Sequence, residues 1–288
     1  MESNAIEEYK NAIFIKLANQ LGNCLRIISS CCIIAKYYGM NAYIDMSVSQ
    51  LWPKELDIVN TLFTDLCKNM ISTDYMELNY NNYVRYTNFY GTNYHLINEG
   101  RFEKPADTNN ISIVSNIYNI IPGDMSEDDF IREKIQFYKS ITYPPFLLDA
   151  VSRFNEKHDL SKYTAFHIRH TDNLKDRQKH KHNFNTPLEI FIQQLNKCLS
   201  NSEKIIVFSD NNDVLKDVKS IHVDILFADN IEFPNFQNLY EMMLLSKSRR
   251  IIGSNSSTFS YESAFFQGTD IELYENGEWK LYELQKYR

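Results

Sequence analysis

The alternation of short apolar segments with amphipathic ones in the C-terminal half constrains the fold more than any other feature of the sequence. Five apolar segments have the length of buried strands: 163–169, 204–210, 222–227, 250–254 and 271–274. Four intervening segments have apolar residues at helical spacing: 187–199, 212–219, 236–247 and 257–267. Strands that alternate with helices predict crossover units and a parallel sheet.

The N-terminal half shows the same alternation less regularly. Strands are expected at 12–18, 42–45, near 94–97 and at 111–115, and helices at 25–38, 55–69 and 127–140. Segment 76–95 is rich in Tyr and Asn, and we expect it to form loops and irregular strand. Its side chains either serve packing and the surface or stack against a sugar acceptor. We therefore expect two α/β domains, 1–155 and 156–288, because Pro144 and Pro145 interrupt the pattern between them.

Composition limits the partners and the compartment. The 288 residues carry a net charge of −7, which argues against a nucleic-acid-binding face. No apolar run reaches the roughly 18–20 residues of a membrane span, and the acidic start MESNAIEEYK does not resemble a signal peptide. The five cysteines form no CxxC motif, so reduced buried thiols and a cytoplasmic location are expected. No metal site is expected, because HKH (180–182) has no nearby carboxylate partner.

Polar residues follow several predicted strands, at the edge where ligands bind in open parallel sheets. In HIRHTDN (167–173), His167 and Arg169 share one strand face. A guanidinium at this place can hold a diphosphate through two parallel hydrogen bonds. The alternative is an ion pair between Arg169 and Asp172 that fixes a loop.

The segment GSNSSTFSYES (253–263) places small hydroxyl residues where a strand ends and a helix begins. Free backbone N–H groups with the hydroxyls of Ser256, Ser257 and Thr258 predict an anion-binding site. Ordinary capping of the helix is the alternative interpretation.

Two further strand ends contribute weaker candidates for donor binding. Gly22 allows a tight turn in NQLGNCLR (19–26), after which Asn23 could reach a cleft. In FSDNND (208–213), Asp210 could reach the ligand, or Asp210 or Asn211 could cap the next helix.

Three segments together resemble the fucosyltransferase superfamily, which includes α1,2-, core α1,6- and protein O-fucosyltransferases. AFHIRHTDN resembles the HxR(R/H)xD motif. MLLSKSRRIIGSNSSTFSYESAFF resembles a helix, a strand and an NSSxS-type loop, and LGNCLRIISSCCIIAKYYGMNAYID is similar to the GxGN opening of the α1,2 group. The resemblance covers residues 15–45 and about 160–270.

The resemblance implies a GT-B-like fold, with two Rossmann-like domains whose parallel sheets face each other across a cleft. It also implies an inverting, metal-independent transfer of L-fucose from GDP-fucose to a hydroxyl of a glycan or glycoconjugate, with no cofactor. By motif, Arg169 would hold the β-phosphate, His167 would lie beside the nucleotide, and Ser257 and Thr258 would contact the phosphates. Glu241 occupies the place of an acidic residue that binds guanine in the core-type enzymes; the alternative is an ordinary surface residue of a helix.

The catalytic base departs from the core-type pattern, which has Glu eight residues after the motif Arg. That place holds Arg177, and the nearest carboxylate is Asp176. Asp172 or Asp176 could accept the proton. Two other functions stay open: a GT-B transferase that uses another GDP- or UDP-linked sugar, and an inactive glycan-binding protein on the same fold.

Overall fold

The computed structural model describes residues 11–17, 20–46, 51, 53–68, 83–86, 100–106, 110–114, 119–169, 186–255 and 257–288. Contacts divide the chain into two units, Met1–Pro144 and Pro145–Arg288. Each unit is a mixed α/β structure built around a sheet that is wholly or mostly parallel.

The N-terminal unit contains a five-stranded sheet with the order β3-β2-β1-β6-β4. Its strands are β1 (Ala12–Lys16), β2 (Asn41–Asp45), β3 (Cys67–Lys68), β4 (Tyr83–Tyr86) and β6 (Asn110–Val114), and all neighbours are parallel. A separate parallel pair joins β5 (Gly100–Phe102) to β7 (Ile120–Pro122). This unit also contains α2 (Leu21–Tyr38), α3 (Pro53–Leu62) and α5 (Glu127–Ser140).

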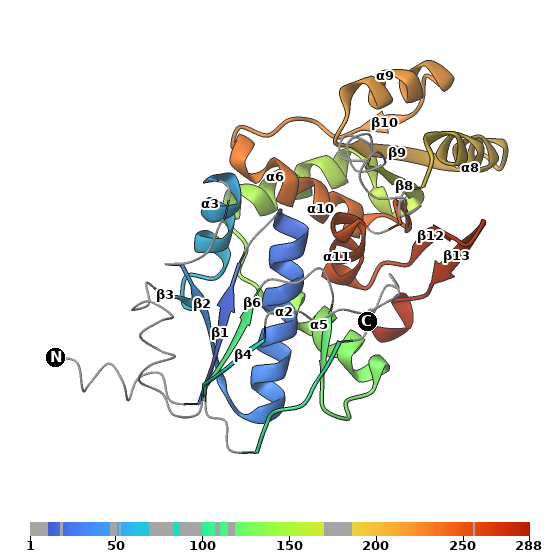
Figure 1. Cartoon of the computed structure of the whole chain (residues 1–288). Coiled ribbons are helices and arrows are strands. Elements are labelled where there is room, and N and C mark those ends of the chain that lie inside the picture. The colour runs from blue at the N-terminus through green and yellow to red at the C-terminus, as the bar shows by residue number, and fades with distance from the viewer. Residues whose placement is uncertain are drawn as a thin grey trace. The chain divides into compact units, whose positions relative to one another are not determined.

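Helix α2 is the main packing element of the N-terminal unit and contacts β1, β2, β7 and α5 (Figure 1). Its apolar residues are buried over most of its length. The helix ends where Gly39 takes a left-handed conformation with φ of 64°, which costs little for a residue without Cβ. Helix α5 begins at Ser126, whose hydroxyl accepts a hydrogen bond from the Asp129 N–H.

The C-terminal unit contains a six-stranded sheet with the order β10-β9-β8-β11-β12-β13. The strands are β8 (Tyr163–Ile168), β9 (Lys204–Ser209), β10 (Leu226–Phe227), β11 (Arg250–Gly253), β12 (Ile271–Glu275) and β13 (Glu278–Tyr282). All neighbours are parallel except β12 and β13. Counted along the chain, this order is 3-2-1-4-5-6, which is the order of a Rossmann-type doubly wound sheet.

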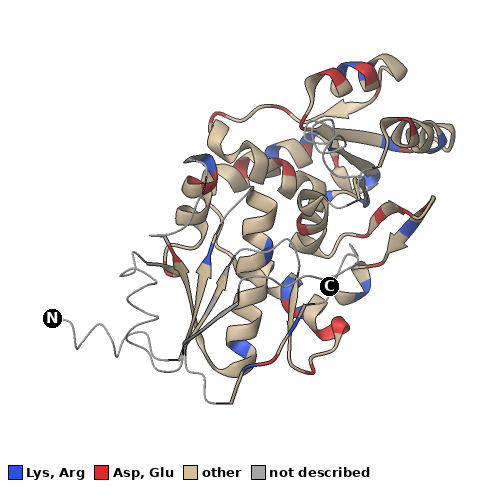
Figure 2. Cartoon of the chain, in the orientation of Figure 1, with Lys and Arg blue, Asp and Glu red and all other residues tan. Residues whose placement is uncertain are grey.

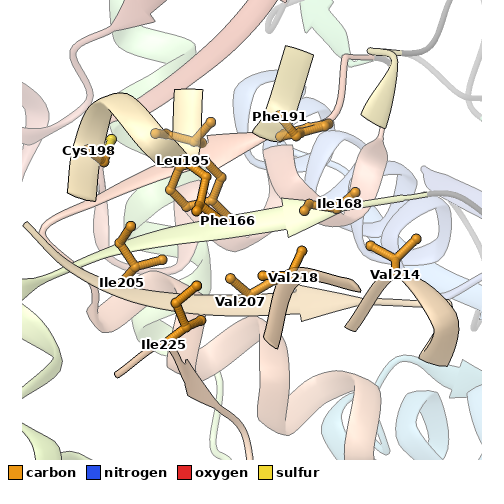
Figure 3. Close-up of a cluster of buried hydrophobic side chains, with 11 residues drawn as sticks. Phe166, Ile168, Phe191, Leu195, Cys198, Ile205, Val207, Val214, Val218 and Ile225 are labelled. Atoms are coloured by element: carbon orange, nitrogen blue, oxygen red, sulfur yellow. The ribbon is translucent and has the colours of Figure 1, made fainter. Parts of the chain in front are cut away.

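The helices of this unit are α6 (Pro145–His158), α8 (Leu188–Ser200), α9 (Asn212–Ile221), α10 (Gln237–Lys247) and α11 (Thr258–Gln267). Three short 3₁₀ turns accompany them, at Leu160–Lys162, Pro234–Phe236 and Gln285–Tyr287. Figure 3 shows the buried apolar cluster in which side chains of β8 and β9 meet those of α8 and α9, including Phe166, Val207, Leu195 and Val218. This cluster fixes β8, the strand that precedes the HIRHTDN segment.

Several helices and strands have boundaries that differ from the predicted ones. The expected helix at 55–69 ends at Leu62, because residues 67–68 pair with β2 as β3. Of the expected strand 222–227, only Leu226 and Phe227 pair. Strand β4 forms inside segment 76–95, while the strand near 94–97 lies outside the described residues.

The division between the units falls between Pro144 and Pro145, before the predicted position at 155 and 156. Pro145 is the first residue of α6, which suits proline because the first helical N–H needs no partner within the helix. Helix α6 contacts α10 and belongs with the C-terminal unit. The proline pair therefore starts a helix that the sequence analysis did not predict.

All five cysteines are free; Cys24, Cys31 and Cys198 are buried, whereas Cys32 and Cys67 are only partly buried. Burial raises the pKa of Cys24 and of Cys32 to about 12. None of the described helices has both the length and the apolar character needed to cross a membrane.

Candidate functional site

The candidate site lies where the strand order of the C-terminal sheet reverses direction. β8 and β11 are neighbours, β9 lies on the far side of β8, and β12 lies on the far side of β11. In sheets of this type, ligands bind beyond the carboxyl ends of the strands at such a switch point. His167 lies near the end of β8 and Arg169 directly follows the strand, while Ser254 directly follows β11. The two strongest sequence motifs therefore meet here.

Ser254 joins the two strand ends through its backbone and its side chain. Its N–H donates to the His167 carbonyl at 3.1 Å, and its hydroxyl lies 3.2 Å from the same oxygen. The Arg169 N–H donates to the Ser254 hydroxyl oxygen at 2.9 Å. Because Ser254 is buried, these bonds fix the backbone from which the half-buried Arg169 side chain projects.

His167 links β8 to α11. Its Nδ1 lies 2.7 Å from the Ser260 hydroxyl, and its ring stacks on Phe259 with centroids 4.7 Å apart. Burial, together with a smaller contribution from the charge of Arg169, lowers the pKa of His167 to about 3, so the ring is neutral near pH 7. Contact between His167 and a nucleotide stays a prediction.

Gly253 lets β11 approach α11 closely. A Cβ built at this position would lie 2.7 Å from the Ser260 Cβ and 2.9 Å from its hydroxyl oxygen. A side chain at 253 would therefore displace the residue that holds His167.

The start of α11 has the features of an anion-binding site. Ser257 occupies the N-cap position, but its side chain makes no capping hydrogen bond. Its hydroxyl is buried and has no hydrogen-bond partner in the described part of the chain. Thr258 is the first helical residue, and the N–H groups of the first turn add a positive partial charge. Simple capping by Ser257 does not account for this arrangement.

Asp210 follows β9 and is exposed, while the neighbouring Asn211 caps α9. The Asn211 Oδ1 accepts hydrogen bonds from the Asp213 N–H at 2.8 Å and from the Val214 N–H at 3.5 Å. Capping therefore does not need the Asp210 carboxylate, whose part in donor binding stays a prediction.

Glu241 lies in α10, where its carboxylate accepts a hydrogen bond from Gln237 Nε2 at 2.9 Å. Burial raises the pKa of Glu241, and the hydrogen bond from Gln237 opposes this rise. Gln237 also donates to the Asp229 carbonyl at 3.3 Å and accepts from the Ile231 N–H at 3.0 Å. The sequence analysis did not single out Gln237, although its spacing of four residues from Glu241 on one helix predicts such a contact.

Asn23 lies in the N-terminal unit, in the first turn of α2 after β1. Its Oδ1 atom is buried and lacks a hydrogen-bond donor among the described residues. Glu55 in α3 also has a buried carboxylate oxygen without a donor, and its charge adds to the rise in the pKa of Cys24, which burial mainly causes. The first turns of α2 and α3 therefore lie close together at the carboxyl edge of this sheet.

The remaining candidates lie outside the described residues: Asp172, Asp176, Ser256 and the HKH segment at 180–182. Among the residues that are described, no three His, Cys, Asp or Glu side chains come together in a way that could hold a metal ion.

Comparison with known proteins relates this chain to others by its fold and not by its sequence. No protein-family model and no curated protein matches the sequence. Among solved structures, the NodZ α1,6-fucosyltransferase soaked with GDP-fucose superposes with a TM-score of 0.58 at 14% identity, over 95% of this chain and 99% of that chain. A mutant of Arabidopsis thaliana FUT1 in complex with GDP gives 0.51 at 14% identity, over 96% and 75%. The POFUT1 apo-form gives 0.50 at 10% identity, over 91% and 96%. The chain therefore shares the fold of fucosyltransferases.

Proposed function

We propose that this protein is a fucosyltransferase that transfers L-fucose from GDP-fucose to a hydroxyl of a glycan or glycoconjugate. The observation that carries the proposal is the junction of β8 and β11. There the Arg169 N–H donates to Ser254, and the Ser257 hydroxyl has no partner among the described residues. The likeness to NodZ, whose crystals were soaked with GDP-fucose, supports the choice of donor. We further propose a GT-B arrangement, in which the carboxyl edges of the two parallel sheets face one cleft.

The diphosphate of the donor is the group that suits the junction. A guanidinium offers two parallel hydrogen bonds to phosphate oxygens, and the α11 start offers free N–H groups and the Ser257 and Thr258 hydroxyls. Both sets of donors are held by the fold before a ligand arrives. Asn23 and Asp210 are further candidates for donor contacts.

The proposed reaction is an inverting displacement. The acceptor hydroxyl oxygen attacks the anomeric carbon of fucose while the bond from that carbon to the diphosphate oxygen breaks. The electron pair of the broken bond passes to GDP, where Arg169 and the α11 start stabilise the growing negative charge. Asp172 or Asp176 accepts the hydroxyl proton.

Glu241 is the candidate for base recognition. Its two carboxylate oxygens can accept hydrogen bonds from guanine N1–H and N2–H, a donor pair that adenine and uracil do not offer. The hydrogen bond from Gln237 Nε2 to Oε1 orients this carboxylate. Each carboxylate oxygen can accept two hydrogen bonds, so both remain able to accept from guanine.

Nucleotide-dependent thermal stability tests the proposal. A ligand present at 100 times its Kd stabilises the folded state by about 2.7 kcal/mol, so GDP should raise Tm clearly while UDP and ADP at the same concentration should not. Glu241→Gln, which replaces an accepting oxygen with an amide donor, should lose this preference. Glu189→Gln on the exposed side of α8 is the matched control and should keep it. A stronger response to UDP, or no response to any nucleotide, would overturn the proposal.

A further inference from the structure

A cavity of about 470 Å³ opens in the C-terminal unit between α6 and the segment that joins β10 to α10. One wall is α6 and the other is segment 229–233, and Tyr240 of α10 also lines the cavity. Among the described residues, none of the proposed donor-binding side chains lines it. We call this cavity the α6 groove.

One continuous face of α6 forms the first wall. The lining positions are 146, 149, 150, 153, 154 and 157, which follow the three- and four-residue spacing of a single helix face. At 1.5 Å per residue these positions span about 16 Å. The groove is therefore elongated and can hold an extended ligand.

Aromatic rings form one end of the groove. Phe146 and Phe233 pack with centroids 4.2 Å apart, and Phe236 meets Phe146 edge-on at 5.2 Å. Phe233 nevertheless remains 46% exposed. Its ring is thus supported on one side and offers an apolar surface to a ligand.

The lining also carries five charged side chains that have no ion-pair partner among the described residues. Arg153 and Lys157 of α6 lie with the acidic Asp149, Asp229 and Glu232, and Figure 2 shows both signs along α6. None of these five side chains makes an ion pair or a hydrogen bond with another described residue.

The position of Tyr240 supports this arrangement of charges. Burial raises the pKa of Tyr240 to about 12, with Asp229 and Glu241 adding to the rise and Arg153 opposing it. The charges of Asp229 and Arg153 therefore both act on the Tyr240 hydroxyl, which belongs to the lining of the groove.

The second wall is held in place without a ligand. The Gln237 side chain accepts from the Ile231 N–H and donates to the Asp229 carbonyl, so the backbone of segment 229–231 is fixed to α10. A wall ordered in advance lowers the entropy that binding would cost.

These features select among ligand classes. A phosphate or nucleotide would meet three carboxylates and two cations, an unfavourable net charge. A lipid chain would desolvate five charged groups without giving them partners. A neutral polyhydroxylated ligand can donate to the carboxylates, accept from the cations and lay an apolar face on Phe233.

We propose that the α6 groove binds a neutral oligosaccharide, with one sugar ring stacked on Phe233 and hydroxyls bonded to Asp229, Glu232 and Arg153. The bound oligosaccharide could be a distal part of the acceptor glycan or a separate glycan. The first of these two sources rests on the proposed function. Both sources present the same chemistry to the groove.

Saturation-transfer NMR on the full chain tests the proposal with maltotriose, cellotriose and N-acetyllactosamine, in the presence of saturating GDP. At least one saccharide should give a signal that GDP does not remove. Phe233→Ala should weaken its affinity tenfold or more, while Leu148→Ala, which removes another exposed apolar side chain of α6 outside the groove, should not. The thermal unfolding of both variants shows that they are folded.

Three results would overturn the inference: no GDP-resistant signal from any saccharide, wild-type affinity in Phe233→Ala, or equal losses in both variants. The GDP response is measured separately, so failure of the donor proposal is recognised on its own. If the saccharide is part of the acceptor, Phe233→Ala raises the acceptor KM and leaves kcat and donor KM unchanged. If the source is a separate glycan, the acceptor KM is unchanged and binding is still lost.

Discussion

At the scale of single residues, the candidate site depends on contacts between side chains that are far apart in the sequence. Ser254 bonds to the backbone of both His167 and Arg169, and Ser260 holds the His167 ring. A substitution at any of these positions removes its own hydrogen bond and also shifts the backbone that carries Arg169. The site is therefore sensitive to small shifts of α11 against β8.

Arg169→Ala removes the proposed main donor to the leaving diphosphate. Turnover is expected to fall by about 10²-fold or more, the scale observed when one preorganised donor is lost. Steady-state kinetics with GDP-fucose would measure this loss. Arg132→Ala, which removes an exposed arginine of α5, is the control and should retain wild-type turnover. Equal rates for Arg169→Ala and wild type would remove the role assigned to Arg169.

His167 should make the stability of the fold dependent on pH. Its pKa is about 3 in the folded chain and about 6.5 when unfolded, so between these values the unfolded state binds more protons. Stability from this group is fully present above pH 6.5 and is lost as the pH falls, with a slope of up to about 1.4 kcal/mol per pH unit.

Chemical denaturation of wild type and of His167→Asn between pH 4 and 7.5 would measure that slope. The variant should be less stable near pH 7.5, because it loses the contact with Ser260, and it should show a shallower dependence on pH. His222→Asn, which changes an exposed histidine, should keep the wild-type slope. Identical slopes for wild type and His167→Asn would contradict a buried neutral ring.

At the scale of elements, the residues at the two edges of the C-terminal sheet serve different functions. The carboxyl edge carries the candidate site, whereas the amino edge carries an ionic network. Glu203 accepts hydrogen bonds from Arg249, Arg250 and Thr164, and Arg250 also pairs with Glu272 at 3.1 Å. This network ties the amino ends of β8, β11 and β12 to the residue before β9.

Glu203→Ala should therefore lower the free energy of unfolding without changing the affinity for GDP. Removing the carboxylate leaves the exposed Arg249 and the buried Thr164 hydroxyl without this acceptor, and leaves Arg250 with Glu272 as its remaining carboxylate partner. The expected cost is roughly 1–3 kcal/mol. GDP affinity should stay within about twofold, because the network lies at the opposite edge from the α11 start. Glu278→Ala on the exposed part of β13 is the control for stability. A large loss of GDP affinity in folded Glu203→Ala would contradict this division between the two edges.

The β12–β13 hairpin is an element that local sequence could have revealed. Asn276 and Gly277 both have positive φ, at 52° and 93°, which is the conformation of a two-residue hairpin turn. The Asn-Gly pair between β-type segments is a strong signal for such a turn, yet the sequence analysis ended at 274. Helix α6 is different, because its neighbouring proline pair favoured a boundary as readily as a helix start.

At the scale of the whole molecule, two parallel sheets occur in one chain whose fold matches fucosyltransferases at 10–15% identity. Such a fold tolerates sequence change because apolar patterning and short crossovers specify it, while few individual residues are required. The shared fold leaves the acceptor open, since the sequence resemblance to fucosyltransferases does not extend to residues 46–150.

Metal dependence is a property of the complete enzyme, and we expect none. If Arg169 and the α11 start supply the donors to the diphosphate, transfer from GDP-fucose should be unchanged by excess EDTA. Adding Mg²⁺ or Mn²⁺ back to the chelated protein should give no gain in rate. A strict requirement for added metal would instead indicate a UDP-sugar enzyme with a different mode of diphosphate binding.

The sequence by itself determined the α/β class, most elements of the C-terminal half and the strand ends that carry polar residues. These features follow from local periodicity and from the rule that ligands meet parallel strands at their carboxyl ends. Only the tertiary structure decided that His167 faces Ser260, that Ser257 leaves its hydroxyl unpartnered, and that α6 forms a groove with segment 229–233. Those facts depend on residues distant in the chain, and no local pattern specifies which distant side chain will lie within 3 Å.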